Sequence, residues 1–342
     1  GKATNASYRE LFVLEDADAG ETIFARAYKS DESIAIRHGI QFDYKNGKRS
    51  ATQRFMNHYL KKDGTAYTES ELASMEYYDQ FQNRDPRMAQ TVQGPAYVAV
   101  GATSRESLDW ERTLNGYRII KYISDASHEG ATTSTSDFVL FRYAEVLLNY
   151  AEAKAELGTL TDADVAATID LIRDRVGMPK MKTVPTVADP VMEKYYPNAK
   201  GAQKAAILEI RRERTVELCF EGFRQWDLLR WKEGKWITPA STKGFQGIYL
   251  TGLGEFDLDK DGKMDICVYK GTKPSTTAPA SNVLEIGKNW TLSEGTKGNL
   301  TYYASENYTW DEGKDYLWPI PEDQRQITNG ALSQNPGWSD GL

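Results

Sequence analysis

The sequence is poor in the residues that disulfide frameworks and zinc sites require. It holds 2 cysteines and 3 histidines among 342 residues. Cys219 and Cys267 are too few for a disulfide framework or a zinc ribbon. His38, His58 and His128 lie far apart, without the H-E-x-x-H spacing of a catalytic zinc site. The sequence therefore argues against both kinds of protein, and we expect Cys219, within an apolar helical stretch, to be a buried small side chain.

Long apolar runs and excess positive charge are also missing. No stretch approaches the roughly 18 apolar residues of a membrane helix, and the polar opening G-K-A-T-N has no apolar segment typical of a signal peptide. The net charge of −7 disfavours nucleic acid as a partner, because nucleic-acid binding depends on clustered Lys and Arg. Neither a G-x-S-x-G motif, nor a P-loop, nor a G-x-G-x-x-G motif after a strand occurs.

Aromatic residues, in contrast, are abundant. They make up 11% of the chain, with 20 Tyr and 8 Trp, and many lie in polar, Gly-rich surroundings. One interpretation is a loop-rich protein whose loops are held by aromatic packing. The other is a surface that stacks on flat ligand faces. Composition alone favours the first.

The middle of the chain has the periodicity of amphipathic helices. Apolar residues at i, i+3 and i+4 predict a helix capped by Ser136 or Asp137 and ending near 158, and a second over 162–177. Together they predict an antiparallel hairpin of the tetratricopeptide type. A third helical segment over 202–231 is broken at Gly222. We expect a mainly α fold with a helical core at about 136–232, loop-rich segments at about 1–135 and 233–342, and a few short β-strands.

The strongest local motif is an acidic loop with the spacing of a calcium-binding loop. Its candidate ligands alternate along the chain: Asp257, Asp259, Asp261, the Lys263 carbonyl and Asp265. Alternate Asp side chains can converge on one hard cation, and Gly262 permits the tight bend. Val268 stands where such loops usually carry a bidentate Glu, and 266–269 is typical of a strand. A structural Ca²⁺ site and a solvated acidic turn in a hairpin remain alternatives.

Three glutamates recur every four residues on one helical face, at Glu213, Glu217 and Glu221. A glycoside hydrolase would use Glu217 and Glu221 as an acid/base pair, which requires one carboxyl with a raised pKa. Arg214 and Arg224 lie one turn away, and neighbouring cations lower carboxylate pKa values. The pattern favours an ion-pair network that joins helices over a catalytic pair.

Several long motifs occur in order along the chain. They are NRDPR at 83–87, GYRIIKY at 116–122, RYAEVLLNYAEA at 142–153, IRDRVGM at 172–178, RRERTVELCFEGFRQWDLLRW at 211–231, YLWPIP at 316–321 and QNPGW at 334–338. This set resembles the RagB/SusD family of outer-membrane nutrient-binding lipoproteins, from about residue 54 to the end. The front of the chain has no counterpart of the lipidated Cys and first helices of that family. The resemblance therefore implies the C-terminal portion of such a protein.

The resemblance implies one SusD-like domain over 1–342 that lacks its N-terminal part. It implies a non-enzymatic protein exposed on the outer membrane, which captures a glycan or related nutrient for a TonB-dependent, SusC-like transporter. Contact with the membrane would be made only through an N-terminal lipid anchor absent from this chain. The alternative is a tetratricopeptide-type scaffold that binds a protein and no sugar, and a glycoside hydrolase is less favoured.

Ligand contacts are expected in the stretch between 87 and 116, where ligand-contacting aromatic residues tend to occur in that family. Two aromatic residues there are Tyr97 and Trp110, matched by their order along the chain. Trp110 lies in an acidic, polar setting, where a buried Trp is less expected, whereas Tyr97 could equally be a packed strand residue. The candidate polar partners of the ligand are Asp109, Glu111 and Arg112.

Overall fold

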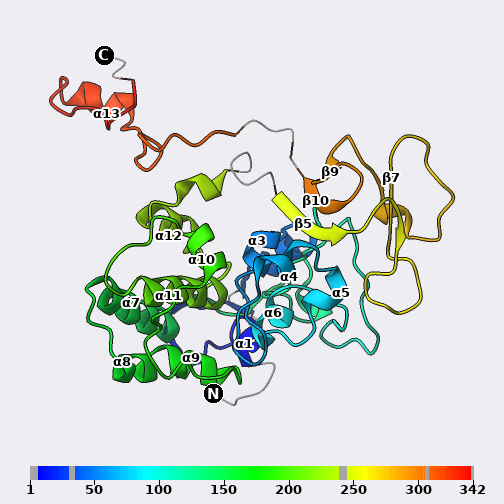
Figure 1. Ribbon diagram of the computed structural model, residues 1–342, viewed down its shortest axis with the longest axis horizontal. Coiled ribbons are helices and arrows are strands. Elements are labelled where there is room, and N and C mark those ends of the chain that lie inside the picture. The colour runs from blue at the N-terminus through cyan, green and yellow to red at the C-terminus, as the bar shows by residue number, and fades with distance from the viewer. Residues whose placement is uncertain (1–6, 31–34, 239–244, 303, 305–307, 340–342) are drawn as a thin grey trace.

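The computed structural model describes residues 7–30, 35–238, 245–302, 304 and 308–339. Figure 1 shows longer helices gathered on one side, small sheets on the other and short helices between them. The C-terminal helix α13 (Glu322–Ile327) lies apart from this body. Pro321 precedes the first residue of that helix as its N-cap. Within the described residues, no helix is both long enough and apolar enough to cross a bilayer.

The helical side is built from segments that the sequence predicts to be helical, except for Pro190–Tyr195 and Gly234–Ile237, which were not predicted. Its elements are α7 (Tyr143–Glu156), α8 (Asp162–Ala167), α9 (Ile169–Arg175), α10 (Pro190–Tyr195), α11 (Lys204–Glu217), α12 (Arg224–Arg230) and the 3₁₀ turn η2 (Gly234–Ile237). Thr161 and Asp164 form a capping box at the start of α8. The apolar faces of α7 and α11 meet in one buried cluster, which includes Leu148 and Ile207 at 0% exposure.

The first helix of this side begins later than predicted. Residues Phe138–Arg142 form strand β4, which pairs antiparallel with β1 (Thr22–Arg26). Asp137 caps no helix; its carboxylate accepts hydrogen bonds from the backbone of Ala17 and Tyr28. The prediction of helix at 136–142 was wrong because a distant strand supplies the backbone partners, and a local apolar pattern cannot show such pairing. The second predicted helix is also divided, into α8 and α9.

The loop-rich N-terminal part is held by short elements. They are α1 (Ser7–Glu10), β2 (Lys29–Ser30), β3 (Ala35–Ile36), α2 (Ile40–Asn46), α3 (Gln53–Met56), α4 (Glu69–Ala73), α5 (Tyr77–Gln80), α6 (Pro86–Thr91) and η1 (Ala126–His128). Asp85 caps α6, and Pro86 fills its first position. These elements fix α3 against the helical side, since Arg54 of α3 donates to the carbonyl of Tyr195.

Two small sheets form the opposite side. One has the strand order β5 (Phe245–Leu250), β10 (Gly298–Tyr302), β9 (Trp290–Leu292), and all its pairs are antiparallel. The other has the order β6 (Gly254–Phe256), β7 (Ile266–Tyr269), β8 (Val283–Glu285), with η4 (Ala280–Asn282) before β8. The strand predicted at 266–269 is confirmed as β7. Both cysteines are free and buried, as expected for Cys219.

Candidate functional site

A cavity of about 560 Å³ lies where α3, the turn between α11 and α12, and η2 meet. Six aromatic side chains line it: Phe55, Tyr195, Phe220, Phe223, Trp236 and Phe245. Its polar lining includes Gln53, Arg54, Asn57, Thr215, Arg224 and Gln225. Ligand sites typically measure roughly 300–1,000 Å³ and combine apolar walls with a few placed polar groups. The size and lining of this cavity fit that description.

The turn between α11 and α12 supplies one wall of the cavity. Phe220 has a φ of 60° and Gly222 a φ of 92°, so the chain adopts the left-handed conformation twice within three residues. That conformation is costly for a bulky side chain such as Phe220. The ring of Phe220 packs edge-on against Phe55, with 5.3 Å between ring centroids. The turn ends α11 and brings Phe223 and Arg224 to the cavity.

Arg54 forms the second wall with two aromatic rings. Its guanidinium carbon lies 3.5 Å from the ring centroid of Trp236 and 4.7 Å from that of Tyr195. Nη2 donates to the Tyr195 carbonyl at 2.6 Å. Burial lowers the pKa of Arg54 to about 9. A guanidinium group is weakly hydrated and stacks well on aromatic faces, so the rings partly offset the loss of water.

Arg224 approaches the same region from α12. Its Nη1 donates to Tyr196 Oη at 3.0 Å and to Thr215 Oγ1 at 2.9 Å. Behind this wall, His58 Nδ1 donates to the Arg54 carbonyl, so its Nε2 accepts from Tyr196 Oη at 2.7 Å. Burial and the nearby cations, Arg224 first, hold the pKa of His58 well below its usual range. His58 is therefore neutral and acts as a support of the wall.

The structure places the two predicted ligand aromatics in the interior. Trp110 is 2% exposed within the core cluster of the small sheets, and Tyr97 is 8% exposed beside Ile120. The expectation of an exposed Trp110 was wrong, because its ring packs in this cluster and its backbone N–H donates to Asn282 Oδ1. Ligand contact by Trp110 and Tyr97 stays a prediction that requires this region to open.

The polar candidates of that stretch lie together in a surface turn. The backbone of Glu111 donates to Asp109, and Arg112 Nη1 pairs with Glu106 at 2.7 Å. Arg112 Nε lies 3.6 Å from Asp109. None of the five predicted contacts lines the cavity described above, so the structure separates the predicted stretch from the aromatic cavity.

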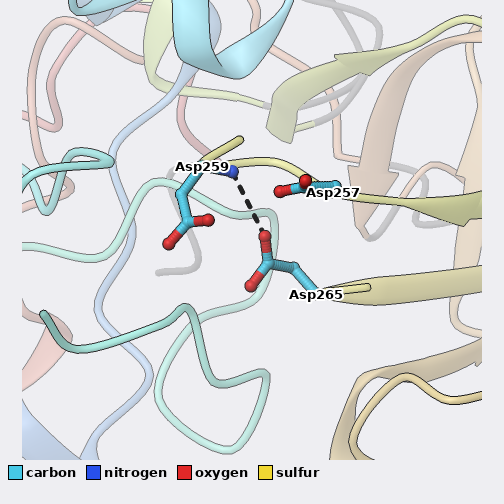
Figure 2. A group of neighbouring side chains, drawn as sticks. All are labelled: Asp257, Asp259 and Asp265. Atoms are coloured by element: carbon cyan, nitrogen blue, oxygen red, sulfur yellow. Dashed lines mark hydrogen bonds between the residues drawn. The ribbon is translucent and has the colours of Figure 1, made fainter. Parts of the chain in front are cut away.

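The acidic loop joins β6 to β7, and Figure 2 shows three of its carboxylates. Asp257, Asp259 and Asp265 offer oxygen atoms that all lie within 4.8 Å of one another. Asp261 is not part of this group, since its carboxylate accepts the backbone N–H of Lys263 at 2.9 Å. The structure therefore brings together three of the four predicted carboxylates. A hard cation such as Ca²⁺ takes oxygen ligands of this type.

Burial and neighbouring carboxylates raise the pKa values of two aspartates in this loop. Burial, and then the neighbouring carboxylate of Asp259, raise the pKa of Asp265 to about 6. Burial and the carboxylate of Asp261 also raise the pKa of Asp259. Asp265 Oδ2 accepts hydrogen bonds from the backbone of Leu258 and Asp259, which hold it facing the other carboxylates. Residues of this kind could hold a cation, whose charge would reverse these shifts.

The glutamate face of α11 is a buried ion-pair network. Glu217 is 0% exposed and pairs with Arg87 at 2.9 Å, Arg142 at 2.6 Å and Arg175. Despite the cost of burial, these three cations hold the pKa of Glu217 well below its usual range. Glu221 pairs in turn with Arg142. The prediction of a network joining helices is confirmed for Glu217, whose partners come from α6, β4 and α9.

The two arginines that lie one turn away from the glutamates in the sequence are not their partners. Arg214 Nε pairs with Asp227 at 2.7 Å, and Arg224 donates to the hydroxyls of Tyr196 and Thr215. The turn at Phe220 redirects the chain, so helical spacing no longer relates Arg224 to the glutamates. Within the described part of the chain, Arg224 has no carboxylate partner within 4.0 Å. This arrangement could not be predicted from the sequence, because the geometry of the turn decides it.

A helical, loop-rich fold with an aromatic cavity is typical of a protein that binds a small organic ligand. The family comparison agrees with that class. The sequence profile of the SusD family matches residues 20–338, and the chain belongs to this family. Among curated proteins, none matches the chain.

Solved structures share the fold. A SusD-like protein from Bacteroides fragilis superposes with a TM-score of 0.60 at 22% identity, over 98% of this chain and 58% of that one. A SusD-like carbohydrate-binding protein from the same species gives 0.55 at 20% identity, over 95% of this chain and 57% of that one. The chain thus spans less than two thirds of the length of these relatives. The SusD-like fold is confirmed, whereas the tetratricopeptide-type description of its hairpins stays a prediction.

Proposed function

We propose that this chain binds a glycan or a related nutrient in the aromatic cavity, without altering it. The observation that carries the proposal is the cavity itself, which sets six aromatic side chains beside amides, hydroxyls and guanidinium groups. Sugars present flat C–H faces bordered by hydroxyls, so such walls and polar groups suit them. A relative described as a carbohydrate-binding protein shares the fold and supports the same ligand class.

The absence of turnover is part of the proposal. The glutamates that a hydrolase would need are Glu217 and Glu221, and both are enclosed by cations. A general acid needs a raised pKa, whereas Arg142 and its neighbours lower the pKa of both carboxyls despite the opposing effect of burial. These two residues therefore support a structural role.

The experiment is a glycan array probed with the 342-residue chain, followed by calorimetry on the glycans that bind. Trp236→Ala should weaken binding strongly, because it removes an aromatic wall of the cavity. Trp226→Ala is the matched control, since Trp226 is exposed and does not line the cavity. Equal affinity of the Trp236 variant and the native chain would place the site elsewhere, and Trp110→Ala would then test the stretch predicted from the sequence.

The cellular setting is proposed from the family. We expect the protein to stand on the outer face of the outer membrane, held by a lipid anchor, and to deliver its ligand to a TonB-dependent, SusC-like transporter. Co-purification of the protein with such a transporter from detergent-solubilised outer membranes tests this setting. Recovery of the protein without any transporter would count against it.

A structural Ca²⁺ ion in the acidic loop is a separate proposal. The converging carboxylates of Asp257, Asp259 and Asp265 support it, and so does the raised pKa of Asp265, caused first by burial. The ion would hold the connection between β6 and β7 and has no assigned part in glycan binding. The Asp261 carboxylate is not part of this group, and the Lys263 carbonyl stays a predicted ligand.

One observation favours a protein-interaction scaffold as the second candidate function. Four apolar side chains are exposed at helical spacing: Tyr143, Val146 and Tyr150 of α7, and Leu157 just after its end. Such a stripe suits an amphipathic helix of a partner protein. Replacing Val146 and Leu157 with Lys should abolish that binding and leave glycan binding unchanged, so the two functions can be separated.

A further inference from the structure

The lining of the cavity contains two arginines that form no ion pair with a carboxylate of the described residues. The first is Arg54. Most buried arginines of this protein pair with carboxylates; Arg142 contacts Glu217 at 2.6 Å, for example, while Arg84 is an exception that donates to the Met56 carbonyl. Arg54 has no carboxylate within 4.0 Å among the described residues. Its Nη2 donates to a backbone carbonyl, and its Nε atom is buried without a hydrogen-bond partner. Burying a cation without a counter-ion costs free energy, so such a group at a cavity indicates a site for an anionic ligand.

Arg224 is the second cation in this position. Its hydrogen bonds go to the hydroxyl groups of Tyr196 and Thr215, which are neutral. The guanidinium carbons of Arg54 and Arg224 lie 5.7 Å and 5.6 Å from the ring centroid of Tyr196. The two groups therefore flank one aromatic ring, and each lowers the pKa of the nearby His58. Both line the cavity.

The acidic residues nearby do not neutralise these two cations. Asp227 lines the cavity, but its carboxylate is held by Arg214 at 2.7 Å and by Arg230 at 2.8 Å. Glu233 attracts Arg54 electrostatically but forms no ion pair with it. Its Oε1 accepts the backbone N–H of Asn198 at 2.9 Å. The lining thus keeps two positive charges beside aromatic rings and amides.

On the basis of the proposed function, we propose that the saccharide bound here is anionic, and that its carboxylate or sulfate lies between Arg54 and Arg224. Planar guanidinium groups match the geometry of such oxyanions and form charge-assisted hydrogen bonds with them. The Phe223 and Trp236 rings then face the apolar surface of the sugar. Gln225, an exposed residue of the lining, supplies an amide group for its hydroxyls.

The test compares three probes on the 342-residue chain by calorimetry: an oligogalacturonide, the same oligomer with its carboxyl groups reduced to alcohols, and a sulfated oligosaccharide. The anionic probes should bind at least about tenfold more tightly than the reduced one, because the loss of one charged hydrogen bond weakens the affinity by about that factor. Preference for the uronate identifies a carboxylate, and preference for the sulfated probe identifies a sulfate. Affinity should fall as salt rises.

Single substitutions test which arginines cause the preference for the anionic probes. Arg54→Gln and Arg224→Gln should each remove most of the preference for the anionic probe, so that the affinities for the anionic and the reduced probe become similar. Arg224→Gln keeps the test informative if Arg54→Gln does not fold. Arg49→Gln is the matched control, because Arg49 is exposed and pairs with Asp43 outside the cavity.

Two results would overturn the inference in different ways. Equal affinity for the anionic and reduced probes, with loss of both in Trp236→Ala, would refute the anionic group and leave the proposed function standing. Failure of every saccharide probe to bind, neutral or anionic, would refute the proposed function as well.

Discussion

At the scale of single residues, burial and charge give similar side chains different roles. Glu217 is 0% exposed and contacts three arginines, whereas Asp265 faces other carboxylates. Burial opposes the charged form of both groups. The cations around Glu217 overcome that effect and lower its pKa, while the anions around Asp265 add to it and raise its pKa. The first arrangement is complete without a ligand, and the second fits a cation.

Glu217→Gln should destabilise the protein by roughly 3–5 kcal/mol, because it removes a buried carboxylate that Arg87, Arg142 and Arg175 share. Denaturant unfolding measures this change. Glu69→Gln is the matched control: Glu69 pairs with Lys194 at 2.9 Å on the surface, and exposed pairs contribute at most about 1 kcal/mol. A similar small effect for both variants would show that the buried network does not stabilise the fold.

Calcium should stabilise the protein more at about pH 7.5 than at about pH 5. The folded pKa of Asp265 is raised to about 6, from about 3.9 in an unfolded chain. Without a cation, the stability that this group contributes is present below the unfolded pKa and is lost as pH rises through the folded pKa. Calcium needs the ionised form, so its stabilising effect grows over that same range.

Thermal unfolding with calcium or with a chelator measures this effect, which reaches about 2.7 kcal/mol at a calcium concentration 100 times Kd. The double variant Asp257→Asn, Asp259→Asn should lose the response. Asp16→Asn, an exposed aspartate outside the loop, should keep it. A melting temperature that is independent of calcium at both pH values would eliminate the site.

At the scale of elements, local pattern predicts helices well and their ends poorly. The apolar stripe of α7 and the break at Gly222 follow from spacing and from glycine, and both are observed. The strand at Phe138–Arg142 could not be predicted, because its partner β1 lies more than 100 residues earlier. That pairing also brings Arg142 to Glu217, so the same contact that misleads the helix prediction completes the ion-pair network.

Leu148→Ala should cost roughly 2–5 kcal/mol, because Leu148 is 0% exposed where α7 packs against α11. Leu157→Ala is the control just after the end of the same helix. Leu157 is 76% exposed, so its replacement should change the free energy of unfolding by at most about 0.5 kcal/mol. Chemical denaturation of the two variants compares these costs, and equal values would contradict the assigned core.

At the scale of the whole molecule, the family was predictable and the cavity was not. The family rests on long motifs that are continuous in the sequence, and the SusD profile covers residues 20–338. The cavity combines Arg54, Tyr195, Phe220 and Trp236, which are far apart along the chain and meet only through packing. Trp110 and Tyr97 were chosen by their order in the sequence, which carries no information on burial, and both rings lie inside the fold.

The most direct test of the account is fluorine NMR of the 342-residue chain labelled with 5-fluorotryptophan, with its 8 tryptophan signals assigned by single Trp→Phe variants. The oligosaccharide that binds most tightly is then titrated in. If the ligand binds in the aromatic cavity, the Trp236 signal shifts with the binding isotherm, while the signals of buried Trp110 and exposed Trp226 stay in place. A shift of the Trp110 signal without a change in the Trp236 signal would contradict binding in the aromatic cavity. It would place the site in the stretch between residues 87 and 116.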